Sequence, residues 1–178
     1  MSLRKRNAPP PSATRNAPMR FGAPRQPERL VGVGFRCWFA GYDTCDIDCW
    51  ETGWNYYARE LGVSRAKEAV GELACWVRAV RDTACRKIAY YPFGCAGFAP
   101  DECVAISMVA AGQHAQCPAM RACAFALLGT SDIDTVVDSA QKFACVLADT
   151  GYVLSDQSIC NANLLVDPAH TGIQDLNH

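Results

Sequence analysis

The cysteines constrain this chain more than any other feature of its sequence. Eleven cysteines are spread singly through 178 residues, and an odd number of thiols cannot pair completely into disulfides. Their positions are Cys37, Cys45, Cys49, Cys75, Cys85, Cys95, Cys103, Cys117, Cys123, Cys145 and Cys160. Reduced cysteine behaves as a small hydrophobic residue and is often buried. We therefore expect most of these thiols to be reduced and sheltered in a helical core.

The first residues do not resemble an export signal. The basic start, Met1 to Arg6, is followed by a proline-rich stretch where a signal peptide would have its apolar region. Because disulfides are uncommon in reducing compartments, the numerous single cysteines also favour a cytoplasmic protein. No apolar run approaches the roughly 20 residues that a membrane-spanning helix needs.

The N-terminal segment is strongly basic. Residues 1–30 have a net charge of +6, whereas the other residues sum to −7. Six of the ten prolines also fall within residues 1–29, which we expect to form an arm that is disordered alone or ordered by a partner. The arm carries the expected charged contacts, which are Arg4, Lys5, Arg6, Arg15, Arg20 and Arg25. An acidic protein surface is the favoured partner, with nucleic acid or an anionic membrane surface as alternatives.

Residues 30–42 show the alternation of a β-strand. Apolar side chains at every second position alternate with glycines and Arg36 along the sequence. No second segment with equally clear strand alternation follows nearby, so a hairpin is not expected. We therefore expect an extended lead-in segment that lies on the helical body or on a partner. Its expected partner-binding side chains are Val31, Val33, Phe35, Trp38 and Phe39.

The remaining sequence has helical periodicity, with apolar residues at steps of three and four. The expected helices cover residues 47–61, 64–88, 100–111, 117–128, 131–150 and 155–165. Connections this short favour antiparallel neighbours. The sequence thus predicts an all-α fold, a compact bundle of five to six helices within a domain of residues 30–166, with a loose tail at 167–178.

Residues 90–98 form an aromatic, glycine-rich loop between two predicted helices. Such a loop either frames a pocket or is fixed to the core by its aromatic side chains. The sequence alone favours the second role.

The strongest metal-ligand pattern surrounds the next helix. Cys95, Cys103, His114 and Cys117 have the donor types of a tetrahedral zinc site, but their spacing lacks the paired knuckles of most structural zinc sites. The favoured expectation is no cofactor, with zinc as the alternative. Cys117 at a helix start near His114 could also be an activated nucleophile, although no orienting group or oxyanion hole is evident.

The sequence therefore favours a non-enzymatic interaction protein or accessory subunit of an assembly. A cysteine-based metal-binding or thiol redox-sensing module is the first alternative. A nucleic-acid-associated protein is the second, which the basic arm permits and the acidic body disfavours.

Overall fold

The fold is all-α, as the sequence predicted. The computed structural model describes residues 26–159, so residues 1–25 of the expected arm and the whole of the expected tail, residues 167–178, lie outside that range. Residues 26–29, which were also expected in the arm, belong instead to the first helix. The described helices are α1 (Gln26–Thr44), α2 (Ile47–Leu61), α3 (Val63–Thr83), α4 (Pro100–Gln113), α5 (Cys117–Leu128) and α6 (Asp134–Asp149), followed by a 3₁₀ turn η1 (Asp156–Ser158). None of the described helices has both the length and the apolar character to cross a membrane.

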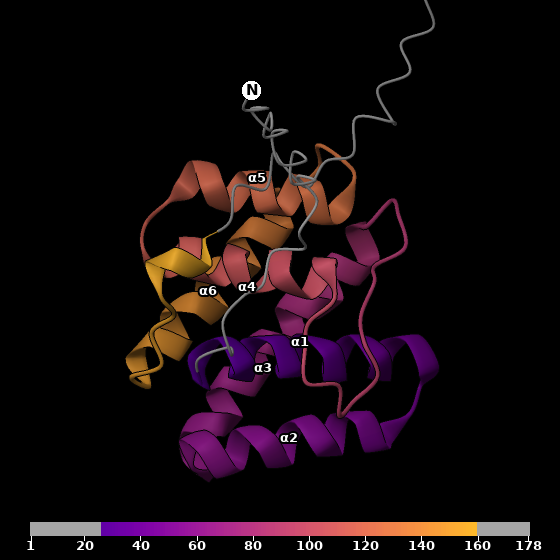
Figure 1. The fold of residues 1–178 in the computed structure, drawn as a ribbon, viewed down its shortest axis with the longest axis vertical. Helices are drawn as coiled ribbons and strands as arrows, with labels where there is room; N and C mark the ends of the chain where they lie inside the picture. The colour runs from indigo at the N-terminus through magenta and orange to yellow at the C-terminus, as the bar shows by residue number, and fades with distance from the viewer. Residues whose placement is uncertain (1–25, 160–178) are drawn as a thin grey trace, which may run out of the picture.

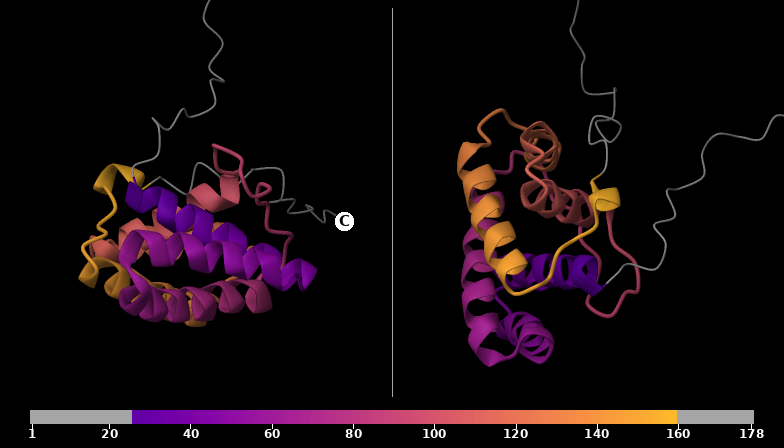
Figure 2. Two further views of the ribbon diagram at one scale, coloured as in Figure 1. Left: turned by 90° about the horizontal axis from the view of Figure 1, so that it is seen from below. Right: turned by 90° about the vertical axis from the view of Figure 1, so that its left-hand side faces the viewer.

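The six helices form two crossing layers. Helices α5, α4, α1 and α2 are stacked in that order in one layer, in which α4 packs on both α5 and α1 (Figure 1). Behind them, α3 and α6 run side by side across the stack, as the right-hand view of Figure 2 shows. This crossing leaves α1 and α4 at the centre of the molecule.

The extended conformation expected for residues 30–42 is wrong, because these residues belong to α1. Leu30, Val31, Phe35, Trp38 and Phe39 are all buried in the core. A helix that is covered on most sides has apolar residues at nearly every position, so a period of two can be read from it as easily as a period of 3.6. Strand-like alternation was therefore a consequence of central burial.

Three of the other helices have the expected boundaries to within two residues. Asp46 caps α2 by accepting a hydrogen bond from the Asp48 backbone N–H at 3.0 Å, and Gly62 ends that helix at a φ of 78°. Helix α3 is shorter than expected because it ends at Thr83 instead of continuing to Ile88. Ile88 is buried, but it belongs to the connection between α3 and α4.

The C-terminal end of α4 captures the segment that follows α6. The Gln113 side-chain amide donates to Tyr152 O at 3.0 Å and accepts from the Leu154 N–H at 2.8 Å. His114 Nε2 lies 2.8 Å from Leu154 O, so this ring nitrogen carries the proton and donates. Leu154 is thereby held in the core, and the helix expected over 155–165 is reduced in the described part to η1.

Candidate functional site

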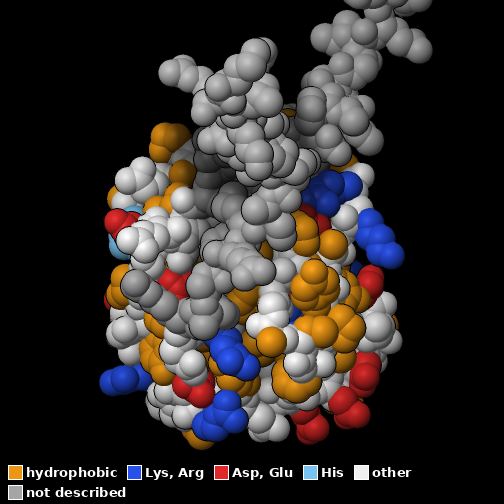
Figure 3. All heavy atoms as spheres, viewed as in Figure 1, with side chains coloured by type: hydrophobic (Ala, Val, Ile, Leu, Met, Phe, Trp, Pro, Cys, Tyr) orange, Lys and Arg blue, Asp and Glu red, His pale blue; other side chains and the backbone are white. Residues whose placement is uncertain are grey.

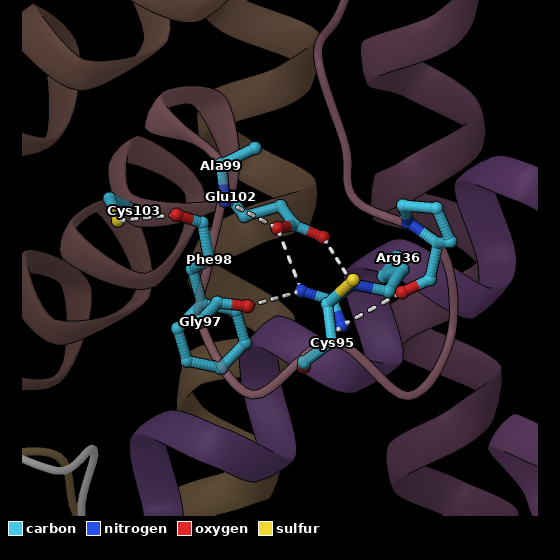
Figure 4. Close-up of polar contacts among 8 residues, drawn as sticks. Arg36, Cys95, Gly97, Phe98, Ala99, Glu102 and Cys103 are labelled. Atoms are coloured by element: carbon cyan, nitrogen blue, oxygen red, sulfur yellow. Dashed lines mark hydrogen bonds and ion pairs between the residues drawn. The ribbon is translucent and has the colours of Figure 1, made fainter.

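The connection between α3 and α4, residues 84–99, is held by a buried ion pair. Arg36 of α1 makes a bidentate contact with Glu102 of α4 through the Nε–Nη2 edge of its guanidinium, with Nε–Oε1 and Nη2–Oε2 distances of 2.6 Å and 2.9 Å (Figure 4). The two side chains are only 2% and 0% exposed. Burial opposes the charged form of Arg36, but the Glu102 carboxylate outweighs it and raises the pKa of the guanidinium. Arg36 therefore stays charged inside the protein.

The same guanidinium binds the backbone of the loop. Arg36 Nη1 donates to Cys95 O at 3.1 Å and to Pro92 O at 3.4 Å, and Nη2 donates to Gly97 O at 2.7 Å. Glu102 Oε2 accepts from the Ala99 N–H at 2.6 Å. Figure 4 shows these groups converging between α1 and the start of α4. One buried pair thus fixes a loop that has no regular secondary structure of its own.

Phe98 and Gly32 bring this end of the loop against α1. The Phe98 ring lies 5.5 Å from the Arg36 guanidinium, within the range of a cation–π contact. A Cβ atom at Gly32 would overlap the same ring. Glycine at position 32 is therefore required for the close approach of loop and helix.

The other end of the loop is held by a second ion pair. Arg86 forms a bidentate contact with Asp101 and also donates from Nε to Ala126 O at 3.1 Å. Asp101 Oδ2 accepts from the Ala89 N–H at 2.6 Å. Tyr90 then donates its hydroxyl to Asp43 at 3.0 Å. The two adjacent carboxylates at the start of α4 consequently hold both ends of one connection.

A cavity of about 180 Å³ lies where the fixed loop meets α1 and the first turn of α2. The lining side chains are mostly aromatic, aliphatic or thiol groups, with two carboxylates from the α2 start. They include Cys37, Asp46, Asp48, Cys49, Tyr90, Tyr91 and Phe93. The volume is below the roughly 300 Å³ of pockets that hold drug-sized ligands, so the cavity is sized for one side chain.

Large apolar side chains are exposed around this cavity. Phe93 is 63% exposed, Tyr91 is 43% exposed, and Ile47 between the two aspartates is 66% exposed. Figure 3 shows hydrophobic side chains gathered where the loop crosses α1, with acidic side chains beside them near the start of α2. We call the cavity and these three exposed side chains the loop face. An anchored aromatic surface of this kind is typical of a binding site.

Residues 43–51 give the loop face an acidic edge. This stretch contains Asp43, Asp46, Asp48 and Glu51 and no basic residue. All four acidic side chains are exposed, and the next basic residue along α2 is Arg59. Because Arg36 is neutralised by Glu102, the cavity itself supplies no compensating cation.

Cys37 forms part of the cavity floor and is chemically passive there. Burial, followed by the influence of Cys49, raises the pKa of the Cys37 thiol to about 12. The thiol is therefore protonated at neutral pH and contributes apolar surface.

The structure overturns the assignment of α1 side chains to partner binding. Phe35, Trp38 and Phe39 are buried against α2, α3 and the loop, where Phe35 packs on Trp76 and Phe39 on Tyr90. Val31 is fully buried, and Val33 is half-buried against the core. These side chains stabilise the fold and are not available to a partner. The basic residues of the arm lie outside the described residues.

The expected metal ligands are not brought together. Cys103 and His114 lie at opposite ends of α4, about 16 Å apart at 1.5 Å per residue, whereas zinc ligands share one ion at 2.0–2.3 Å. His114 instead binds Leu154 O, Cys117 is exposed at the start of α5, and Cys95 is exposed in the loop. Within residues 26–159, no cluster of three or more His, Cys, Asp or Glu side chains could hold a metal ion.

The expected burial of the thiols is also wrong. Only Cys37 and Cys123 are buried among the described cysteines, and two more are half-buried. Six are exposed, namely Cys45, Cys75, Cys85, Cys95, Cys117 and Cys145. Cysteine at exposed positions of the helices and loops does not follow the apolar stripes that form the core.

Sequence reasoning did not identify the residues that build the loop face. Arg36 and Glu102 are 66 positions apart, and no local pattern connects them. The signal that existed was the aromatic loop itself, for which both expected roles apply: Phe98 packs on α1, while Tyr91 and Phe93 surround a cavity.

Comparison with known proteins adds no relative, because no family model, curated protein or solved structure matches this chain.

Proposed function

We propose that this protein is a non-enzymatic interaction protein, an accessory subunit that binds a partner protein through its loop face. The observation that carries the proposal is that Tyr91 and Phe93 are exposed on a loop whose backbone is fixed by the buried Arg36–Glu102 pair. Exposed aromatic side chains on a preorganised backbone lose little entropy on binding, which favours their use as interface anchors.

The basic arm provides the second proposed contact. Arg4, Lys5, Arg6, Arg15, Arg20 and Arg25 would steer the encounter with an acidic partner surface. A protein partner is favoured over nucleic acid or an anionic membrane, because a protein can present an acidic patch to the arm and an apolar patch to the loop face. Phosphate groups spread over the whole partner surface would instead be repelled by the four carboxylates at the edge of the loop face. The six exposed thiols support a location in the reducing cytoplasm.

The test compares two exposed phenylalanines. Phe93→Asp removes an anchor from the loop face, whereas Phe125→Asp introduces the same change at a 47%-exposed position on α5. Both variants, and the protein lacking residues 1–25, are used with wild type to capture partners from native extract. We expect Phe93→Asp to abolish capture and Phe125→Asp to preserve it, with weaker and less salt-dependent capture after deletion of the arm.

Equal capture by both phenylalanine variants and wild type would exclude the loop face as the interface. Equal capture without residues 1–25 would exclude the arm. Circular dichroism of each variant confirms that the helices are retained, so that lost capture reports lost contacts.

A further inference from the structure

We propose that the loop-face cavity is also a docking site for the chain's own basic segment, residues 15–25, with Arg20 and Phe21 as the central contacts. This inference goes beyond the proposed function, because it concerns the protein without its partner. It assigns the cavity a ligand of defined chemistry: an apolar aromatic side chain next to a guanidinium.

Charge complementarity is the first argument. Residues 1–25 contain six basic residues and no acidic one, whereas residues 43–51 contain four acidic residues and no basic one. Asp46 and Asp48 line the cavity itself. Asp46 caps α2 and Asp43 accepts a hydrogen bond from Tyr90, but all four side chains remain exposed. Because a carboxylate can accept several hydrogen bonds, they can also pair with guanidinium groups while these contacts of the fold remain.

The lining of the cavity is the second argument. Phe21 is the only aromatic residue of the arm, and it directly follows Arg20. The cavity is sized for one side chain and is surrounded by Tyr90, Tyr91 and Phe93. An aromatic ring packs favourably in such surroundings, and the faces of the tyrosines accept an arginine by cation–π contact.

The length of the connecting chain is the third argument. The α1 residues that line the cavity, Arg36 to Ala40, are about 15–21 Å along the helix from Gln26, where the described structure begins. Five extended residues span about 17 Å, which brings Phe21 back along α1 to the near edge of the cavity, beside Arg36. The more distal basic residues, Arg4 to Arg6, are not needed to reach the site.

Docking of this segment would regulate the loop face. Phe21 and the partner would contact the same aromatic side chains, so the arm would cover the interface until a partner displaces it. The partner would then gain both the exposed loop face and the released basic segment. The arm would act as a competitor before binding and as a contact afterwards.

The test uses amide NMR spectra of the full chain. The double substitution Arg20→Gln with Phe21→Ala is compared with Leu3→Ala and Arg4→Gln, a matched pair that also removes one charge and one apolar side chain from the arm. We expect the first variant to shift the amide resonances of residues 46–49 and 90–93, and 0.5 M salt to shift them in wild type in the same direction. The distal variant should leave them unchanged.

A peptide of residues 15–25, added in trans, provides a second readout. A tethered segment has an effective concentration of about 1 mM, so the wild-type arm should exclude the peptide, whereas the Arg20→Gln, Phe21→Ala protein should bind it at residues 46–49 and 90–93. Shifts that appear only on concentrating the protein would assign the contact to a second copy and overturn docking within one chain. Unchanged resonances, or equal changes from both variants, would overturn the site. Neither the spectra of the variants nor the peptide titration depends on partner capture, so the docking proposal can fail while the proposed function stands, and the reverse.

Discussion

The two ends of α4 both capture a distant segment, but they use different chemistry. At the N-terminal end, Asp101 and Glu102 hold the α3–α4 loop through ion pairs with arginines. At the C-terminal end, Gln113 and His114 hold the segment after α6 through hydrogen bonds without ion pairs. The first arrangement leaves Tyr91 and Phe93 exposed, whereas the second buries Leu154. The hydrogen bonds at the C-terminal end therefore add a residue to the core, whereas the ion pairs at the N-terminal end support an exposed surface.

This difference has a physical reason. A buried ion pair is no more stabilising than well-packed apolar residues, because desolvation of both charges offsets their attraction. The guanidinium, however, offers five donors in a fixed plane and can bind several carbonyl oxygens at once. Arg36 uses them on Glu102, Pro92, Cys95 and Gly97. A loop without a helix or strand can thus be fixed while its side chains face outward.

The largest expected effect is from breaking the buried pair. Glu102→Gln leaves the Arg36 charge buried without its counterion and should lower the free energy of unfolding by about 3–5 kcal/mol. Urea unfolding measures the loss. The double variant Arg36→Met with Glu102→Met removes both charges and should recover much of it while still releasing the loop backbone. If the single and double variants lose equal stability, the loss comes mainly from the released loop backbone contacts and not from the unpaired charge of Arg36.

A second prediction concerns alkaline pH at the charged end. Burial raises the pKa of the Cys37 thiol to about 12 in the folded protein from its ordinary value of 9.0, so above pH 9 the unfolded chain loses its thiol proton first. Unfolding is thereby favoured, and stability should fall between about pH 9 and pH 12 by up to about 1.4 kcal/mol per pH unit from this group. Urea midpoints across this window measure the slope.

Cys37→Ala is the control for this alkaline loss. It should reduce the slope without abolishing it, because burial also raises the pKa of Tyr57. A slope identical to that of wild type would mean that Cys37 is ionised or exposed in the folded protein.

Contacts at the C-terminal end of α4 should contribute less to the free energy of unfolding than the ion pairs at its N-terminal end. Gln113→Ala removes the partner of Leu154 N and one donor to Tyr152 O, with an expected loss of about 1–3 kcal/mol. Hydrogen exchange should accelerate at Leu154 and leave residues 92–99 unaffected. If the protection of both segments falls together, the two ends of α4 are coupled and do not act as separate anchors.

The sequence predicted the helices more completely than the contacts between them. The end of α2 depends on a local effect and was therefore recognisable: Gly62 adopts a φ of 78°, which favours glycine. Helix α1 was mistaken for an extended segment because central burial hides the helical period. The end of α3 was misplaced because Ile88 continues the apolar spacing, although Arg86 and Ala89 bind Asp101 instead of extending the helix. The loop face depends on long-range pairs such as Arg36–Glu102, for which a single sequence gives no local signal.

The smallest expected effect on stability is at Phe93, the residue proposed as the anchor for a partner. Phe93 is 63% exposed and makes little contact that folding requires, so Phe93→Ala should change the free energy of unfolding by less than about 0.5 kcal/mol. Phe98→Ala in the same loop should cost about 3 kcal/mol or less, because its half-buried ring packs on Gly32 and Arg36. The thermal unfolding midpoints of the two variants show whether Phe98 stabilises the loop while the exposed Phe93 ring does not. Equal losses would show that Phe93 supports the loop itself, and the aromatic surface would then belong to the fold.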